Sequence, residues 1–290
     1  MKAIRILLPM VFGLSLATSA VAETISAKIV SGSTVASAPS WMAALWVDKG
    51  AETDFCGGTL IDSQWIMTAA HCVIEADSDS VITTMIGQAD ISAYPDNIAT
   101  IDEIYIYPYF NTSSFYGDIA LLHLTTAQSN RPVTLPYSNA SSYLSTGISM
   151  RVYGWGETSA AVTQNDSLSV NLLQTAALTY QGFDSDHPGF IFAGDDQSDT
   201  CFGDSGGPLM LYDNSIQYGI TSIGFASTCA TGIAGGYTDV SRYSSWIDST
   251  IGWADDSGDD SDSSGGGGDT EMILLGSALL LLRLTSRFKL

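Results

Sequence analysis

Basic residues are scarce in this sequence. Only 10 of its 290 residues are Lys or Arg, against 31 Asp or Glu, and the formal net charge is −21. Residues 29–254 contain four of those basic residues and 23 of the acidic ones. Phosphate groups and anionic lipid surfaces are both recognised by basic surface, so the composition argues against a nucleic-acid-binding protein and against a polybasic membrane-surface protein.

Long apolar runs are also missing. No segment reaches the roughly 18 to 20 consecutive apolar residues that a membrane-spanning helix needs. Sustained amphipathic helix patterns are absent too, except over 243–251. There Trp246, Ile247 and Ile251 have helical spacing and predict a C-terminal helix.

The rest of the chain from residue 29 to about 243 alternates short apolar runs with turns, and its many glycines are typical of tight turns. Several runs alternate with period two, which predicts strands. The runs are 41–47, 59–61 with 65–69, 81–86, 98–107, 119–124, 149–153, 168–178, 208–212 and 218–224. Many short strands of this kind indicate an all-β barrel or sandwich.

The N-terminal end reads as an export signal. Lys2 and Arg5 are followed by an apolar run at 6–17 and by Ala-Val-Ala at 20–22, which is a small-residue cleavage site. The signal peptide is therefore predicted over 1–22, and residues 23–28 then form a short propeptide.

The C-terminal end contains an Asp/Ser/Gly linker at 254–271 and an apolar segment with a basic end at 272–290. The apolar run at 272–282 spans only about 16 Å as a helix, short of a hydrocarbon core of about 30 Å. The tail resembles the GlyGly-CTERM sorting tails of bacterial exported proteins, which implies removal by a rhomboid-type membrane protease. It departs from that pattern at Asp269 and Glu271, and a simple membrane anchor or a docking helix remains an alternative.

The four cysteines are Cys56, Cys72, Cys201 and Cys229. None forms a Cys-x-x-Cys pair, which argues against a zinc ribbon. Export into an oxidising compartment favours two disulfides instead. Four cysteines allow three connectivities, and spacing alone does not choose among them.

Three motifs carry nucleophilic chemistry. The segment GDSGGP at 203–208 places Ser205 among small residues, which let a substrate approach the hydroxyl and whose N–H groups could bind an oxyanion. TAAHC at 68–72 provides His71, and DIALL at 118–122 provides Asp118. The order His71, Asp118, Ser205 is one of the three chain orders known for a serine triad.

These motifs resemble those of the chymotrypsin/trypsin family of serine proteases. The resemblance runs from residue 29 to about residue 251 and is also carried by IVSG at 29–32, FCGGTLI at 55–61, GWG at 154–156, Ser222 and GGY at 235–237. It implies two six-stranded antiparallel β-barrels with the active site in the cleft between them. The protease domain is then expected over 29–253, with the boundary between the barrels near residue 131.

The resemblance also implies catalytic roles. Ser205 would be the nucleophile, His71 the general base and then acid, and Asp118 the residue that holds the imidazole in the required tautomer. The N–H groups of Gly203 and Ser205 would form the oxyanion hole. His123 is expected to be structural and His187 solvated.

Substrate binding follows from the trypsin-like branch of the family. Asp199, six residues before Ser205, would form the floor of the primary pocket, and Gly224 and Gly235 its walls, which implies cleavage after Arg or Lys. Ser222 would lie near Asp118, and its backbone would pair with an extended substrate.

Activation and cross-linking are implied in the same way. Cleavage of the Lys28–Ile29 bond would free the amino group of Ile29 to pair with Asp204. The implied disulfides are Cys56–Cys72 and Cys201–Cys229. Met150 and Leu211 stand where a further disulfide occurs in relatives, and apolar contact can replace it.

The expected protein is thus an exported, trypsin-like serine endopeptidase made as a zymogen, and the alternative is an inactive protease-fold binding module at the cell surface. No cofactor and no metal are expected. A structural calcium ion is not expected because Gln88 stands where calcium-binding relatives begin their loop with a carboxylate. Expected partners are protein or peptide substrates, an activating protease and a tail-processing membrane protease, with no nucleic acid. The expected product is a monomer exported through the periplasm to the medium or the cell surface, with the tail as a transient membrane anchor.

Overall fold

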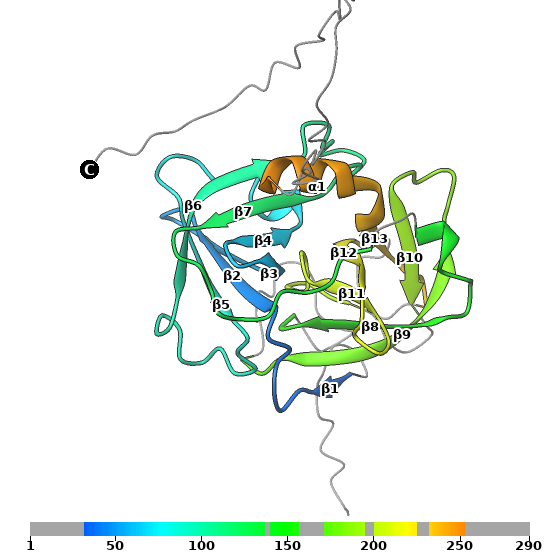
Figure 1. Cartoon of the computed structure of the whole chain (residues 1–290), viewed down its shortest axis with the longest axis horizontal. Helices are drawn as coiled ribbons and strands as arrows, with labels where there is room; N and C mark the ends of the chain where they lie inside the picture. The colour runs from blue at the N-terminus through cyan, green and yellow to red at the C-terminus, as the bar shows by residue number, and fades with distance from the viewer. Residues whose placement is uncertain (1–31, 137–139, 157–170, 195–199, 225–231, 253–290) are drawn as a thin grey trace, which may run out of the picture.

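The computed structural model describes residues 32–136, 140–156, 171–194, 200–224 and 232–252. Their N-terminal part forms a closed antiparallel barrel with the strand order β2-β3-β4-β7-β6-β5 (Figure 1). Its strands are β2 (Met42–Asp48), β3 (Thr53–Asp62), β4 (Trp65–Thr68), β5 (Val81–Ile86), β6 (Ala99–Ile106) and β7 (Ala120–Leu124). The barrel closes through the pairing of β2 with β5.

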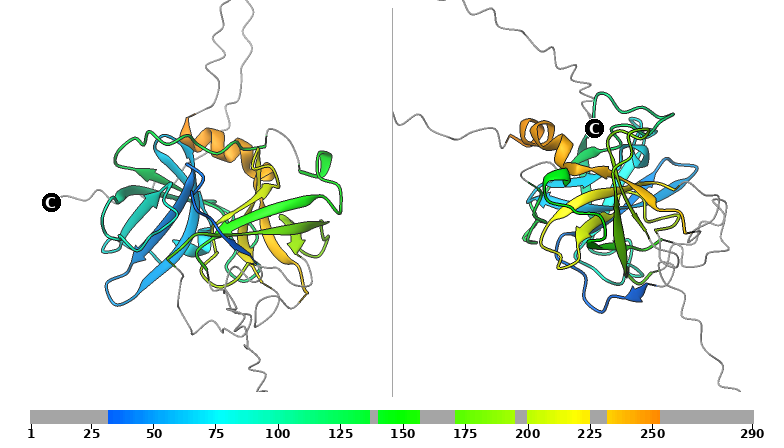
Figure 2. Two further views of the ribbon diagram at one scale, coloured as in Figure 1. Left: turned by 90° about the horizontal axis from the view of Figure 1, so that it is seen from below. Right: turned by 90° about the vertical axis from the view of Figure 1, so that its right-hand side faces the viewer.

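The C-terminal part forms a second antiparallel barrel. Its strands are β8 (Ser149–Gly154), β9 (Gln174–Gly182), β10 (Phe190–Gly194), β11 (Pro208–Leu211), β12 (Gln217–Ile223) and β13 (Gly235–Asp239). They follow the order β9-β10-β13-β12-β11-β8 and close through β8 and β9, and the short β1 (Ser33–Thr34) adds to the outside of β9. The expected fold of two six-stranded barrels is confirmed, and Figure 2 shows the barrels side by side.

Most strands coincide with the apolar runs of the sequence within a few residues, and β5 matches its run at both ends. The run at 168–178 begins earlier than β9, and its first three residues lie outside the described part of the chain. The sequence pattern did not indicate β10 or β13. Strand β13 begins with two glycines, which weaken any strand pattern, yet all five of its residues are buried.

The described helices are short. Three are 3₁₀ turns, η1 (Ala70–Cys72), η2 (Ala140–Ser142) and η3 (Val240–Tyr243), and the last is the α-helix α1 (Ser244–Ile251). Within the described residues no helix is long and apolar enough to cross a membrane. The expected C-terminal helix is confirmed (Figure 1). It packs on the first barrel, where the Trp246 ring meets that of Tyr107 edge-on at 5.5 Å.

One cluster of buried apolar side chains extends across both barrels. The largest cluster of buried side chains joins residues of the first barrel such as Leu60 and Met67 to residues of the second such as Met210 and Ile220. The connection between the barrels is bonded to both, because Val133 N–H donates to the carbonyl of Leu60, and the carbonyl of Thr134 accepts from Gln217 N–H. The barrels are therefore held at a defined junction, where the candidate site lies.

A disulfide in the first barrel and an apolar contact in the second barrel join neighbouring segments of the chain. Cys56 and Cys72 form a disulfide at a sequence separation of 16, as expected. Met150 and Leu211 are cross-strand partners on β8 and β11, and Met150 is buried with Leu211 packed beside its cluster. Strands β8 and β11 are thus joined by apolar contact at this point.

Candidate active site

His71 and Asp118 meet at the end of the first barrel that faces the second. His71 lies in η1, which follows β4 directly, and Asp118 lies two residues before β7. Because β4 and β7 are antiparallel neighbours, the end of one and the beginning of the other are adjacent. The local sequence therefore brings the two side chains together without help from the loops of the second barrel.

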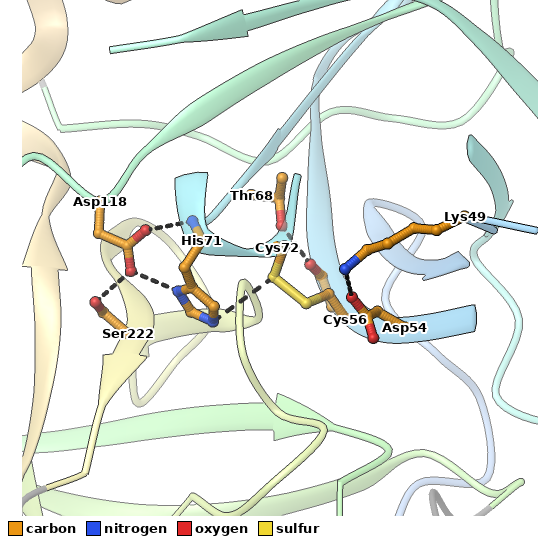
Figure 3. The surroundings of a disulfide bond; sticks show 9 residues. Lys49, Asp54, Cys56, Thr68, His71, Cys72, Asp118 and Ser222 are labelled. Carbon is orange, nitrogen blue, oxygen red and sulfur yellow. Dashed lines mark hydrogen bonds and ion pairs between the residues drawn. A yellow bond between two sulfur atoms is a disulfide. The ribbon is translucent and has the colours of Figure 1, made fainter. Parts of the chain in front are cut away.

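The contact between them consists of two hydrogen bonds (Figure 3). The backbone N–H of His71 donates to Oδ1 of Asp118 at 2.8 Å, and Nδ1 of the imidazole lies 2.7 Å from Oδ2. An ionised carboxylate can only accept, so this contact requires a proton on Nδ1. The Asp118 side chain is fully buried, whereas 24% of the His71 side chain is exposed.

The second barrel holds Asp118 from the opposite side. The hydroxyl of Ser222 on β12 donates to Oδ2 of Asp118, and the hydroxyl of Thr238 on β13 donates to its main-chain carbonyl at 2.9 Å. All three residues are buried. Asp118 is therefore the point at which the histidine of one barrel is attached to the sheet of the other.

The Ser205 loop is attached to both barrels as well. Gly57 N–H on β3 donates to the carbonyl of Ser205 at 2.7 Å, and Gly206 N–H donates to the carbonyl of Thr221 at 2.9 Å. A Cβ at Gly206, whose φ is +78°, would lie 2.2 Å from the hydroxyl of Thr68, so only glycine fits there. The close approach brings the loop beside the strand that leads into His71.

Ser205 and His71 are not hydrogen-bonded in the described part of the chain. The nearest recorded partner of His71 Nε2 is Sγ of Cys72, at 3.9 Å. Hydrogen bonds between nucleophile and base are often long in substrate-free enzymes and shorten when substrate binds.

Asp204 supports the same loop from beneath. Its buried carboxylate accepts from the backbone N–H of Gly156 at 2.9 Å and from that of Cys201 at 2.8 Å. A Cβ at Gly154 would lie only 1.9 Å from Oδ1 of Asp204. The neighbouring Gly203 has φ of +92°, a left-handed conformation that turns its N–H in a direction few other residues allow.

The electrostatics around the site depend on burial. Asp239, which follows Thr238, is fully buried, and burial raises the pKa of its carboxyl, opposed by hydrogen bonds from Ser241 and by Arg242. The outer histidines are paired with exposed carboxylates, His123 with Asp102 at 2.7 Å and His187 with Asp184 at 2.9 Å. Neither of these pairs contacts Asp118.

Among the residues that the structure describes, one group of potential metal ligands lies beside the site. It consists of Cys56, Cys72 and His71, whose ligand atoms lie within 4.8 Å of one another. Both cysteines are in the disulfide, so neither offers a thiolate, and the His71 imidazole is the one ligand that the group retains. The disulfide instead tethers η1, and with it His71, to β3.

Four of the expected functional residues lie outside the described residues: Lys28, Ile29, Asp199 and Cys229. Cys201 is disulfide-bonded, and its pairing with Cys229 stays a prediction. Of the expected pocket walls, Gly224 is exposed directly after β12, and Gly235 is buried at the start of β13.

Some residues at the site carried no signal in the sequence. Thr238 donates a hydrogen bond to the main-chain carbonyl of Asp118. No sequence motif predicts this contact, although Thr238 directly follows the GGY segment at 235–237. The Phe115 ring meets the His71 imidazole edge-on at 5.6 Å, with φ of +56°, unusual for a bulky residue. Only its position three residues before Asp118 hinted at a place in the site.

A protein of the trypsin/chymotrypsin fold is defined by these features: two six-stranded barrels with a histidine, an aspartate and a serine loop at their junction. A family model described as Trypsin matches residues 29–247. The chain is 33% identical over 219 residues to cationic trypsin-3 of Rattus norvegicus, covering 71% of this chain and 83% of that protein. It is 31% identical over 213 residues to a collagenase of Hypoderma lineatum, covering 68% and 76%. The chain belongs to the trypsin family of serine proteases.

Solved structures agree on the fold. The structure titled GrC has a TM-score of 0.66 and 26% identity, covering 77% of this chain and all of that one. The HL collagenase structure has a TM-score of 0.62 at 23% identity, covering 77% of this chain and 99% of that one, and shows the fold alone.

Proposed function

We propose that this protein is a serine endopeptidase in which Ser205 is the nucleophile, His71 the general base and Asp118 the residue that orients the imidazole. The observation that carries the proposal is the pair of hydrogen bonds from His71 to the buried carboxylate of Asp118. A serine hydroxyl is a weak nucleophile until an adjacent base removes its proton, and this pair leaves Nε2 available for that purpose.

The reaction runs in two halves. Nε2 of His71 takes the proton from Ser205 Oγ while the oxygen bonds to the scissile carbonyl carbon, and the same proton then goes to the leaving nitrogen as the C–N bond breaks. Water, deprotonated by His71, next attacks the acyl-enzyme, and the proton returns to Ser205 as the carboxylic acid leaves. Asp118 keeps its negative charge throughout and stabilises the imidazolium.

The oxyanion hole is proposed at the N–H groups of Gly203 and Ser205. Such donors act best when they are held in place before the reaction, because they then need no reorganisation as charge develops. The two hydrogen bonds to the Asp204 carboxylate and the bond from Gly57 to Ser205 support this arrangement.

The proposed specificity is for Arg or Lys before the scissile bond. It rests on the family membership, on Asp199 six residues before Ser205, and on glycines at 224 and 235, which leave room for a long side chain. A carboxylate facing a guanidinium makes a charge-assisted, bidentate contact, so Arg should be preferred to Lys or equal to it.

Such an enzyme must not destroy itself, and three of the four basic side chains of its own domain are engaged in contacts with other residues. Lys49 pairs with Asp54 and Glu75, whose hydrogen bonds raise its pKa to about 12. Arg151 donates to the carbonyl of Tyr212 and lies 4.2 Å from the centre of its ring. The remaining two are Arg131, which precedes Pro132, and Arg242, which donates to Asp239.

Activation and export complete the proposal. Cleavage at Lys28–Ile29 would free an amino group to pair with Asp204 and order the oxyanion loop. N-terminal sequencing of the active enzyme should read Ile29-Val30, and Lys28→Ala should prevent self-activation. The signal at 1–22 would direct export, and the tail at 272–290 would be removed or would anchor the protein.

Peptide hydrolysis tests the proposed specificity. A panel of peptides that differ only in the residue before the scissile bond should be cleaved after Arg and Lys. Asp199→Ser should lose roughly 30- to 4000-fold of that preference, as when one partner of a buried charge pair is truncated. Preference for Phe or Ala, or an unchanged Arg preference in the variant, would overturn the specificity. Absence of any hydrolysis by protein that starts at Ile29 would favour the inactive binding module.

A further inference from the structure

We infer that Thr238 is a positioning residue for the proposed catalytic pair, because its hydroxyl holds the main chain of Asp118 so that the carboxylate stays aimed at His71. The inference rests on the proposed function of that pair. Thr238 touches neither the imidazole nor the Ser205 loop in any recorded contact, so it would act only through Asp118.

The first argument is the hydrogen bond itself. Thr238 Oγ1 donates to the Asp118 carbonyl at 2.9 Å, and both residues are buried. Within the described residues this is the hydrogen bond that the carbonyl accepts. A buried carbonyl that loses its donor cannot turn to water, so removal of the hydroxyl should make the backbone at Asp118 move.

The second argument is the geometry of the sheet behind Asp118. Thr238 on β13 is the cross-strand partner of Ile220 on β12, and the register of these strands shifts between Thr221 and Ile223, at Ser222. The hydroxyls of Ser222 and Thr238 both reach Asp118 from these neighbouring strands. One hydroxyl thereby holds the carboxylate and the other holds the carbonyl.

Two contacts define an orientation where one does not. Ser222 and the backbone N–H of His71 hold the two oxygens of the Asp118 carboxylate, and Thr238 holds the main chain from which that side chain extends. The same two hydroxyls belong to the second barrel, whereas His71 and Asp118 belong to the first. Thr238 thus couples the docking of the barrels to the direction of the imidazole.

The chain offers a matched control at Thr59. Its hydroxyl on β3 donates to Oε1 of Gln217 on β12 at 2.9 Å, and both residues are fully buried. This hydrogen bond also joins the two barrels, but it contacts none of the proposed catalytic residues. Thr59→Val therefore reports what the loss of a buried interbarrel hydroxyl does by itself.

The experiment compares Thr238→Val, Thr238→Ser and Thr59→Val with the wild type in the activated protein. Kinetics on an Arg peptide should show kcat lowered roughly 10-fold in Thr238→Val with KM little changed, since the lost contact misplaces the reacting groups and not the substrate. Thr238→Ser keeps the hydroxyl and should recover most of that loss. Thr59→Val should lower the melting temperature and leave kcat within about twofold of the wild type.

The downfield proton resonance of His71 Nδ1–H gives a readout that needs no activity. It should shift or broaden in Thr238→Val and stay unchanged in the other two variants. If the variants show this pattern of resonances but the wild type hydrolyses no peptide, the proposed function fails and the positioning role of Thr238 stands. An unchanged resonance and an unchanged kcat in Thr238→Val, or an equal fall of kcat in Thr59→Val, would overturn the inference.

Discussion

Gly154→Ala should disable the enzyme while leaving its fold largely intact. A Cβ at this position would lie 1.9 Å from Oδ1 of Asp204, and real Cβ contacts under 3.0 Å essentially do not occur. The carboxylate must therefore move by about 1.1 Å, the difference between these distances. That shift breaks its 2.9 Å hydrogen bond from Gly156 N–H and releases the loop that carries Gly203 and Ser205.

The size of the effect follows from these displacements. Overpacking of this kind costs about 1–3 kcal/mol of folding stability. A misplacement of about 1 Å at a catalytic group lowers the rate roughly 100-fold. The assay is kcat/KM on an Arg peptide, corrected for folded protein by circular dichroism, together with the melting temperature.

A second glycine serves as the control for instability alone. In Gly219→Ala the new Cβ would meet Cβ of Tyr237 at 2.8 Å and Cβ of Leu209 at 3.0 Å, inside the same barrel but away from Asp204. It should lower the melting temperature and keep kcat/KM per folded molecule. Wild-type kcat/KM in Gly154→Ala, or a loss in Gly219→Ala as large as that in Gly154→Ala, would refute the reasoning.

Three further outcomes are expected. Asp118→Asn, whose amide would donate to His71 Nδ1 and force the proton onto Nε2, should lower kcat by about 10⁴-fold in stopped or continuous peptide assays. Replacing Cys56 and Cys72 together with alanine should cost about 3 kcal/mol in urea unfolding, because the cross-link closes a loop of 16 residues; an unchanged midpoint would contradict this. Incubated alone, the active enzyme should remain intact, and neutralising both carboxylates that pair with Lys49 should make the bond after Lys49 the first internal cut seen by mass spectrometry.

The barrel strands could be predicted where their buried positions appear in the sequence as apolar runs. Strand β5 is an apolar run bounded by turns, and the pattern gives both of its ends. Strand β13 could not be found in this way, because two of its five residues are glycine. Its ladders to β10 on one side and β12 on the other hold it in the closed barrel, and such pairing is a property of the whole fold.

In the candidate site, too, the sequence indicated some residues and not others. His71, Asp118 and Ser205 stand in short motifs whose residue types are demanded by the chemistry, so the sequence alone suggested them. Thr238 and Gly57 donate hydrogen bonds to main-chain carbonyls of residues that are distant in the sequence. The sequence around each donor does not indicate which carbonyl it will meet. Such contacts become visible only when the two barrels are placed together.

The most direct test of the account is covalent labelling of the proposed nucleophile. The activated protein should be incubated with a diphenyl phosphonate bearing a basic side chain, then weighed intact and mapped by peptide mass spectrometry. The account predicts one adduct per molecule, on Ser205, formed in step with loss of peptidase activity and absent in His71→Ala. Labelling at another residue, or peptide hydrolysis that survives with Ser205 changed to alanine, would contradict it.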